Sequence, residues 1–203
     1  MPSRSQPLRD PGSGASEHGG GRPLGRLEVI CGPMFAGKTT RLLALLAEAR
    51  AQGRAVAAVK PAIDTRYHAT NITAHTGASA PALTIDSPRE LLALEAEVIG
   101  LDEAHFFESG LHRAVMDLVS IGRRVILAGL DRTSLNEPFG EMGALLIEAD
   151  SVEKLTAPCA RCGRPAVHTI RLFPSRQRIV VGGVGMFENR CRAHLDSPAP
   201  AGE

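Results

Sequence analysis

One short motif restricts the fold of this chain more than any other feature. Residues 32–39 read Gly-Pro-Met-Phe-Ala-Gly-Lys-Thr and fit the pattern G-x-x-x-x-G-K-[ST]. An apolar run, Leu27–Cys31, precedes the motif, and apolar residues at helical spacing follow it from Thr39 to Gly53. A glycine-rich loop between a strand and a helix turns its backbone N–H groups toward phosphate oxygens. The motif therefore predicts a nucleotide-binding α/β domain.

Two side chains of this motif have defined tasks. Lysine at position 38 reaches the β- and γ-phosphates of a nucleotide, and the hydroxyl of Thr39 is a ligand for Mg²⁺. A chance glycine-rich turn is the alternative, but the motif, its strand and its helix would then all have to coincide. The predicted ATP site consists of Gly32, Pro33, Met34, Phe35, Ala36, Gly37, Lys38 and Thr39.

The chain downstream continues the alternation of strands and helices. Residues 55–59, 97–103 and 124–131 predict strands, residues 111–119 predict a helix, and residues 61–81 lack a convincing period and predict a loop. Strand–helix–strand alternation implies a parallel sheet, in which ligands collect at the carboxyl ends of the strands. We therefore expect the glycine-rich loop, Asp102, Glu103 and Asp131 to lie at one edge.

The acidic pair Asp102 and Glu103 follows an apolar strand. Asp102 stands where P-loop enzymes place a carboxylate for the metal ion, so Thr39 and Asp102 form the predicted magnesium site. Neighbouring residues of a strand point to opposite faces, so the two cannot easily share one role, and one can hold the metal while the other works as a base. A solvated charge at the end of the strand is the alternative for Glu103.

Residues 102–105 also spell Asp-Glu-Ala-His, the DEAH box of helicases. A helicase needs a second motor domain and a cationic track for its strand. The chain has 203 residues and a formal net charge of +1, which disfavour both a helicase and extended nucleic-acid binding. It shows neither a run of about 18 apolar residues nor an apolar signal-peptide core, so we expect a cytoplasmic protein without a membrane partner.

Four residues near the C-terminus have the spacing of metal ligands. Cys159 and Cys162 are separated by two residues, as are Cys191 and His194. Two such pairs suit one tetrahedral zinc ion, and a closed site with four ligands is structural. A chance cluster is the alternative.

Composition and pattern divide the chain into four parts. Residues 1–25 are rich in Pro, Gly, Ser and Arg and predict a disordered tail. Residues 26–150 predict the P-loop nucleotide-binding α/β domain, residues 151–196 the zinc-binding domain, and residues 197–203 a second disordered tail.

The aromatic residues lie outside the predicted central strands. The chain has no Trp and one Tyr, and Phe35, Phe106 and Phe107 stand beside the glycine-rich loop or the acidic pair. Aromatic rings in such places are suited to lining a pocket for a planar base. Packing at the edges of the sheet is the alternative.

Taken together, these segments resemble the thymidine kinases of the cytosolic, zinc-containing type (type II). The resemblance runs from about Gly25 to His194. It rests on the motifs GPMFAGKT, KPAIDTRY, LDEAHFF, GLDR, PFG, ADSVEKLTA, CARC, VVGG and CRAH. It implies a RecA-like P-loop core with a mainly parallel sheet, and a small C-terminal zinc-binding β domain whose lasso loop, about Thr169–Phe187, closes over the nucleoside.

The resemblance also implies the reaction. Such an enzyme transfers the γ-phosphate of Mg²⁺-bound ATP to the 5′-hydroxyl of thymidine, and also accepts deoxyuridine, with Glu103 as general base. It is a homotetramer inhibited by dTTP and carries a structural Zn²⁺. The nucleoside-binding residues it implies are Met34, Phe106, Thr169, Val180, Gly182 and Phe187.

Three positions depart from the family pattern. The family usually has Tyr at Phe187, commonly has Gln at His105, and differs in the lid residues 132–135. Asp64 and Arg66 match a family loop near the active site without a definite role. Two other functions stay open on the sequence: a regulatory ATPase with a zinc interaction module, and a deoxynucleoside kinase with another base preference.

Overall fold

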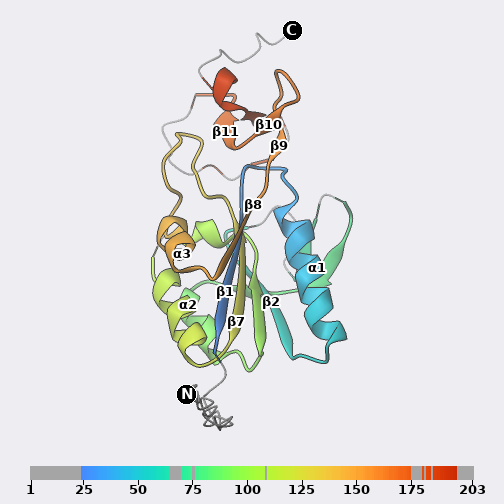
Figure 1. Ribbon diagram of the computed structural model, residues 1–203, viewed down its shortest axis with the longest axis vertical. Helices are drawn as coiled ribbons and strands as arrows, with labels where there is room; N and C mark the ends of the chain where they lie inside the picture. Colours follow the sequence, from blue (N-terminus) through green and yellow to red (C-terminus); the bar gives the residue numbers. More distant parts are fainter. Residues whose placement is uncertain are drawn as a thin grey trace, which may run out of the picture.

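Six parallel strands form the central sheet of the part of the chain that the computed structural model describes. That part comprises residues 24–64, 70–74, 76–107, 109–174, 180, 182–183 and 185–195. In order across the sheet (Figure 1) the strands are β5 (Leu83–Ile85), β2 (Val56–Pro61), β6 (Val98–Leu101), β7 (Arg124–Gly129), β1 (Arg26–Cys31) and β8 (Ser151–Lys154). Every neighbouring pair is parallel. The predicted α/β fold with a mainly parallel sheet is confirmed.

The strand order decides which loops face one another. Strand β7 lies between β1, which leads into the glycine-rich loop, and β6, which leads into Asp102. This is the RecA-like arrangement that the resemblance implies. Because the three strands are parallel, their carboxyl ends form one edge of the sheet. The glycine-rich loop and Asp102 therefore meet over the end of β7.

Helices cover both faces of the sheet. Helix α1 packs on one face, and α2 and α3 pack on the other (Figure 1). The described helices are α1 (Lys38–Ala51), α2 (Leu111–Ser120), α3 (Met142–Glu148) and the 3-10 turns η1 (Pro88–Ala93), η2 (Ala104–Phe106) and η3 (Arg192–His194). The predictions for α1 and α2 are confirmed. Helix α3 was not predicted, because seven residues are too few to display a helical period clearly.

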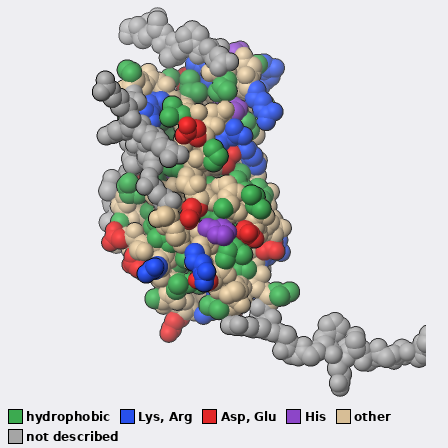
Figure 2. Space-filling model, turned by 90° about the vertical axis from the view of Figure 1, so that its left-hand side faces the viewer, with side chains coloured by type: hydrophobic (Ala, Val, Ile, Leu, Met, Phe, Trp, Pro, Cys, Tyr) green, Lys and Arg blue, Asp and Glu red, His purple; other side chains and the backbone are tan. Residues whose placement is uncertain are grey.

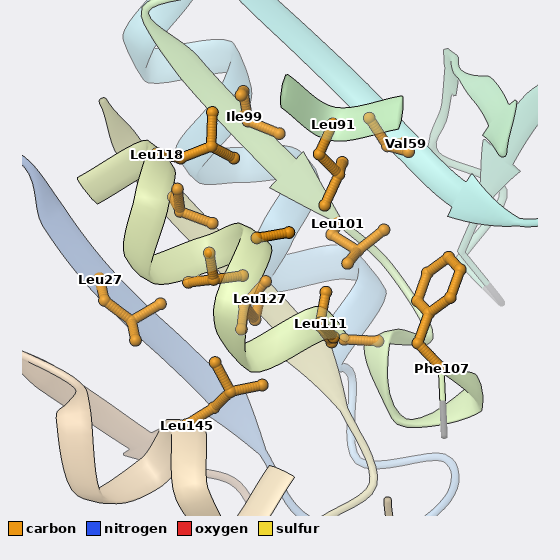
Figure 3. Close-up of a cluster of buried hydrophobic side chains, with 14 of the residues drawn as sticks. Leu27, Val59, Leu91, Ile99, Leu101, Phe107, Leu111, Leu118, Leu127 and Leu145 are labelled. Atoms are coloured by element: carbon orange, nitrogen blue, oxygen red, sulfur yellow. The ribbon is translucent and has the colours of Figure 1, made fainter. Parts of the chain in front are cut away.

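Alternation along the strands divides the core between the two faces. In β7, Val125 and Leu127 belong to the cluster under α2 and α3, whereas Ile126 and Ala128 belong to the cluster under α1. Side chains of a strand point alternately to opposite faces, so one strand supplies both cores. Figure 3 shows side chains of α2, among them Leu111, directed toward the sheet. This double burial holds the strand ends, and the loops on them, in fixed positions.

A short hairpin occupies part of the segment predicted to be a loop. Strands β3 (Asn71–Thr73) and β4 (Ser79–Pro81) pair antiparallel, so the prediction of a loop is wrong for these residues. The turn between them includes Gly77, whose φ of 86° favours glycine. Each strand has only three residues, too few for alternation to stand out in the sequence.

The C-terminal part forms two small strand pairs beyond the carboxyl edge of the sheet, at the top of Figure 1. The pairs are β9 (Ala157–Pro158) with β10 (Pro165–Ala166), and β11 (His168–Arg171) with β12 (Phe187–Arg190). Strand β8 precedes them but pairs with β1, so the central sheet extends beyond residue 150. The predicted domain boundaries otherwise stay a prediction. The predicted tails, residues 1–25 and 197–203, lie outside the described residues except for Leu24 and Gly25.

The surface over α2 and α3 carries charges of both signs. Figure 2 shows acidic, basic and apolar side chains interspersed there, with Lys and Arg side chains more frequent toward the end that holds β9 to β12. Within the described ranges, no helix has the length and apolar character of a membrane-spanning segment.

Candidate active site

The glycine-rich loop connects β1 to α1 with a backbone that only certain residues tolerate. Gly32 has a φ of 133°, and a Cβ on it would lie 2.4 Å from the carbonyl oxygen of Leu155. Gly37 has a φ of 87° directly before the first residue of α1. Glycine is therefore required for both the turn and the close backbone approach. The Nζ of Lys38 donates a hydrogen bond to the carbonyl of Pro33 at 2.6 Å, so the lysine curls over its own loop.

Thr39 and Asp102, the predicted magnesium ligands, are in direct contact. The Thr39 hydroxyl donates to Asp102 Oδ2 at 3.0 Å and lies 3.3 Å from Oδ1. Burial, reinforced by the charge of Glu103, raises the pKa of Asp102 to about 7. A cation beside this carboxylate would favour its charged form and oppose that shift. The hydroxyl and the carboxylate thus offer two oxygen ligands suited to Mg²⁺.

We expect Asp102→Asn to stabilise the protein in Mg²⁺-free buffer, more so as the pH rises. The folded-state pKa of Asp102 lies above its unfolded value of 3.8. The folded state therefore binds the proton more tightly, and the free energy of unfolding of the wild type falls from about pH 4 to about pH 7. Asparagine has no such titration. The measurement is the difference in Tm between variant and wild type from about pH 5 to about pH 8.

The exposed Asp86 supplies the control, because Asp86→Asn removes an equal charge without burial. A Tm difference for Asp102→Asn that stays constant over this pH range would contradict the prediction.

Glu103 lies in a turn, which corrects one sequence expectation. Strand β6 ends at Leu101, and Glu103 has φ 51° and ψ 36°, the left-handed region, at the start of η2. Alternation along a strand therefore does not explain why Asp102 and Glu103 point differently. The turn buries Asp102 beside Thr39 and brings Glu103 to the wall of a cavity. Left-handed backbone on a residue other than glycine is energetically costly and frequent at functional sites.

A cavity of about 230 Å³ opens between the sheet edge and the C-terminal part. The glycine-rich loop lines one side, Glu103 and the residues after it a second side, and β11 with Val180, Gly182 and Phe187 a third. All six predicted nucleoside-binding residues line it, namely Met34, Phe106, Thr169, Val180, Gly182 and Phe187. Of the predicted ATP-site residues, those from Met34 to Thr39 line it as well. The fold thus brings the residues predicted for the two sites together around one cavity.

A closed set of hydrogen bonds fixes the glycine-rich loop to the C-terminal strands. The N–H of Met34 donates to the hydroxyl of Thr169 at 2.9 Å, and that hydroxyl donates to Asn189 Oδ1 at 3.1 Å. The amide nitrogen of Asn189 returns a hydrogen bond to the Met34 carbonyl at 2.8 Å. Because every member both donates and accepts, the relative position of the two parts depends on all three residues.

We expect Thr169→Val to weaken this connection. Valine has a similar shape but leaves the Met34 N–H without its acceptor and removes the donor to Asn189. An unsatisfied buried group costs about 1 to 3 kcal/mol. The free energy of unfolding should fall by that order, and the cavity between the two parts should bind its ligand less tightly. Thr169→Ser retains the hydroxyl and is the control, so equal losses in both variants would contradict the role of this hydroxyl.

Cys159, Cys162, Cys191 and His194 form a cluster that could hold a metal ion such as zinc. Their ligand atoms all lie within 4.8 Å of one another. The sulfurs of Cys162 and Cys191 are 3.8 Å apart, and Cys191 Sγ lies 3.3 Å from His194 Nδ1. A tetrahedral ion with Zn–S bonds of about 2.3 Å requires sulfurs about 3.8 Å apart. The cluster therefore has the dimensions of such a site.

The pKa values of the three thiols in this cluster shift in different directions. Burial raises the pKa of Cys159, but hydrogen bonds from backbone N–H groups and from His194 outweigh it and bring that pKa to about 5. A hydrogen bond from Arg164 lowers the pKa of Cys162, and burial raises the pKa of Cys191. Thiolate is the form that binds a metal. The surroundings of Cys159 and Cys162 favour that form before any ion binds.

Several neighbours of the cavity were missed from the sequence. Asn189 and Arg171 carry no motif, and only the pairing of β11 with β12 places them here.

Asp131 was expected at this edge, and it lies there in an ion pair with Lys154 at 2.6 Å. Asp64 lies 3.8 Å from the buried Lys60, and Arg66 is outside the described residues.

The lid residue Arg132 is connected to the C-terminal part through Asn136, which follows the lid. Asn136 Oδ1 accepts a hydrogen bond from Arg132 at 2.8 Å and lies 3.0 Å from Nδ1 of His168 on β11. Asn136 has a φ of 65°, a left-handed conformation that asparagine tolerates better than most residues. Arg132, in the segment that departs from the family pattern, is thus linked to β11 through Asn136.

The parallel sheet, the glycine-rich loop and the acidic residues after β6 together form an α/β protein whose loop borders a partly apolar cavity. This protein also carries a Cys/His cluster beyond the cavity, and its sequence matches one known family. The family model for thymidine kinase matches residues 25–195, and the chain belongs to that family.

Proteins named thymidine kinase are similar to this chain over most of its length. The one from Coprothermobacter proteolyticus is 42% identical over 182 residues, which cover 86% of this chain and 92% of the relative. The one from Rhodothermus sp. is 39% identical over 90% of this chain and 86% of the relative. The one from Deinococcus deserti is 41% identical over 84% of this chain and 94% of the relative.

Proposed function

We propose that the protein is a thymidine kinase that transfers the γ-phosphate of ATP to the 5′-hydroxyl of thymidine, giving dTMP for pyrimidine salvage. One observation carries this beyond family membership. The glycine-rich loop with Thr39, which contacts Asp102, and Glu103 border a single cavity whose remaining wall includes β11, Val180, Gly182 and Phe187. A nucleotide and a second substrate can therefore meet there.

The phosphate chain of ATP would lie along residues 32–39, with backbone N–H groups and Lys38 facing its oxygens. Thr39 and Asp102 would hold Mg²⁺, which neutralises charge that develops on the transferred group. Glu103 would accept the proton of the attacking 5′-hydroxyl. Its place on the cavity wall, one residue beyond the metal-binding carboxylate, supports this division of roles.

The nucleoside would occupy the pocket lined by Met34, Phe106, Thr169, Val180, Gly182 and Phe187. Apolar walls beside a main-chain segment suit a base with a methyl group, and deoxyuridine fits the same space without it. Phe187 packs against Phe173 with ring centroids 6.4 Å apart. Since Phe187 lacks a hydroxyl, it would contribute packing and no hydrogen bond.

The metal of the Cys/His cluster would be zinc with a structural task. Four protein ligands leave no open position for water or substrate. Among the residues that the structure describes, the buried apolar cluster at β9 to β12 consists of Cys159, Ala166 and Cys191, which is too small a core to hold these strands alone. A bound ion would supply the missing stability.

Family membership also supports a homotetramer, inhibition by dTTP and a cytoplasmic location. Strand β8 ends the sheet, and two apolar side chains near it are exposed, Val152 at 47% and Ile147 at 85%. An open edge with exposed apolar groups is suited to contact with a second copy. Sedimentation of the purified protein measures the oligomer directly.

The test of the function is ADP release by the purified protein with Mg²⁺–ATP and, separately, thymidine, deoxyuridine, deoxycytidine and deoxyadenosine. We expect ADP release to depend on thymidine or deoxyuridine, with the 5′-monophosphate formed in equal amount. Release without any nucleoside would instead identify a regulatory ATPase. Preference for deoxycytidine or deoxyadenosine would identify a kinase with another base preference.

A further inference from the structure

The imidazole of His105 is buried and closely surrounded by its neighbours. Its side chain is 1% exposed, and its ring contacts those of Phe106 and Phe139, with centroids 4.3 and 4.4 Å away. Two glycines leave room for it. A Cβ on Gly129 would lie 3.3 Å from His105 Nδ1, and one on Gly140 would lie 3.0 Å from the His105 carbonyl oxygen. Such enclosure leaves the ring little freedom to turn.

Backbone hydrogen bonding determines the tautomer of His105. The N–H of Leu130, at the end of β7, donates to His105 Nδ1 at 3.1 Å. An acceptor nitrogen has no proton, so a neutral imidazole in this position carries its proton on Nε2. The orientation of the ring and the position of its N–H are thus both set by the main chain of the sheet edge.

The protonated nitrogen faces the carboxylate of Glu103. His105 Nε2 lies 3.5 Å from Glu103 Oε2, while the Glu103 side chain is 16% exposed. This separation is longer than a formed hydrogen bond, as is common for catalytic groups without substrate, whose contacts tighten in the complex. The donor is nevertheless directed at the group that would act as base.

We propose that His105 is a positioning residue for Glu103. By directing Nε2–H at Oε2, it holds the Glu103 carboxylate so that the other oxygen faces the 5′-hydroxyl of the nucleoside. The backbone N–H of Leu130 orients the imidazole in turn. A base oriented by a third group is a recurrent arrangement in enzymes that activate a hydroxyl. The inference rests on the proposed role of Glu103.

The experiment compares His105→Gln and His105→Leu with the wild type. Glutamine can accept from the Leu130 N–H and donate to the carboxylate, whereas leucine can do neither. We expect His105→Leu to lower kcat about 10- to 100-fold with little change in the KM for thymidine, because a base displaced by about 1 Å costs that much. His105→Gln should keep kcat within about 3-fold. His112→Leu, on α2, is the surface control.

A double substitution distinguishes a role of His105 in positioning Glu103 from a role in packing alone. In Glu103→Ala there is no carboxylate to hold, so adding His105→Leu should lower the residual kcat by less than about 2-fold. An equal loss in both backgrounds, or full kcat in His105→Leu, would overturn the proposal. If Glu103→Ala itself has wild-type kcat, the proposed role of Glu103 fails instead.

One measurement does not depend on the folding of a leucine variant. ¹⁵N NMR of histidine-labelled protein reports which ring nitrogen carries the proton, and His105→Gln identifies the His105 signals. We expect a protonated Nε2 whose shift changes in Glu103→Gln. A protonated Nδ1, or an Nε2 chemical shift that does not change in Glu103→Gln, would overturn the proposal.

Discussion

Glu103→Gln should lower the kcat for thymidine phosphorylation about 10²- to 10⁴-fold, the usual contribution of a general base. Glutamine retains the size and polarity of the side chain but cannot accept a proton. Because the hydroxyl of Thr39 donates to Asp102, the substitution leaves the predicted metal ligands in place. The KM for ATP should therefore change little. Steady-state kinetics with each substrate varied in turn measures the effect.

The control for this variant is structural integrity. Its metal content should match that of the wild type and its Tm should not fall below it, since Glu103 lies at the cavity wall and outside the hydrophobic clusters, and removing its charge relieves Asp102. The exposed glutamate of η1 provides a matched substitution, Glu90→Gln, which should leave kcat unchanged. A Glu103→Gln enzyme that retains a tenth or more of the wild-type kcat would exclude Glu103 as the general base.

Cys191→Ser should abolish tight zinc binding and lower kcat/KM for thymidine by about 100-fold or more, equivalent to about 2.7 kcal/mol. Cys191 directly follows β12, the strand that carries Asn189. Without the ion, the C-terminal strands have only a minimal core. Thr169 and Asn189 would then no longer be held against Met34, and the pocket would lose one wall.

The Cys191→Ser substitution should weaken binding of the nucleoside and leave binding of ATP nearly unchanged. The proposed ATP site is the loop between β1 and α1, two elements of the α/β core, so the Kd for ATP should change by less than about 3-fold. Calorimetry with each ligand, together with zinc analysis after dialysis, measures both parts. Cys31→Ala removes a thiol outside the cluster and should keep one zinc ion per chain. Full zinc content in Cys191→Ser would contradict the assignment of the ligands.

Sequence reasoning was most informative where a motif is local. The loop of residues 32–39 must adopt one backbone to surround a phosphate, so its glycines and Lys38 occur at fixed spacing. The cysteine pairs are equally constrained by the size of the ion. Departures from the family pattern, His105 among them, were also visible in the sequence, but their meaning was not. The contacts of His105 with Leu130 and Glu103 exist only in the fold.

By itself, the sequence determined the phosphate-binding loop, the parallel α/β core and the identity of the candidate metal ligands, because these depend on residues close together in the chain. The tertiary structure decided the position of β7 between β1 and β6, the addition of β8 to the sheet, and the turn at Glu103. It also decided the connection of Met34 with Thr169 and Asn189, partners up to 155 residues apart. Contacts over such distances depend on how whole strands pack, and packing leaves no period or spacing in the sequence from which they can be predicted.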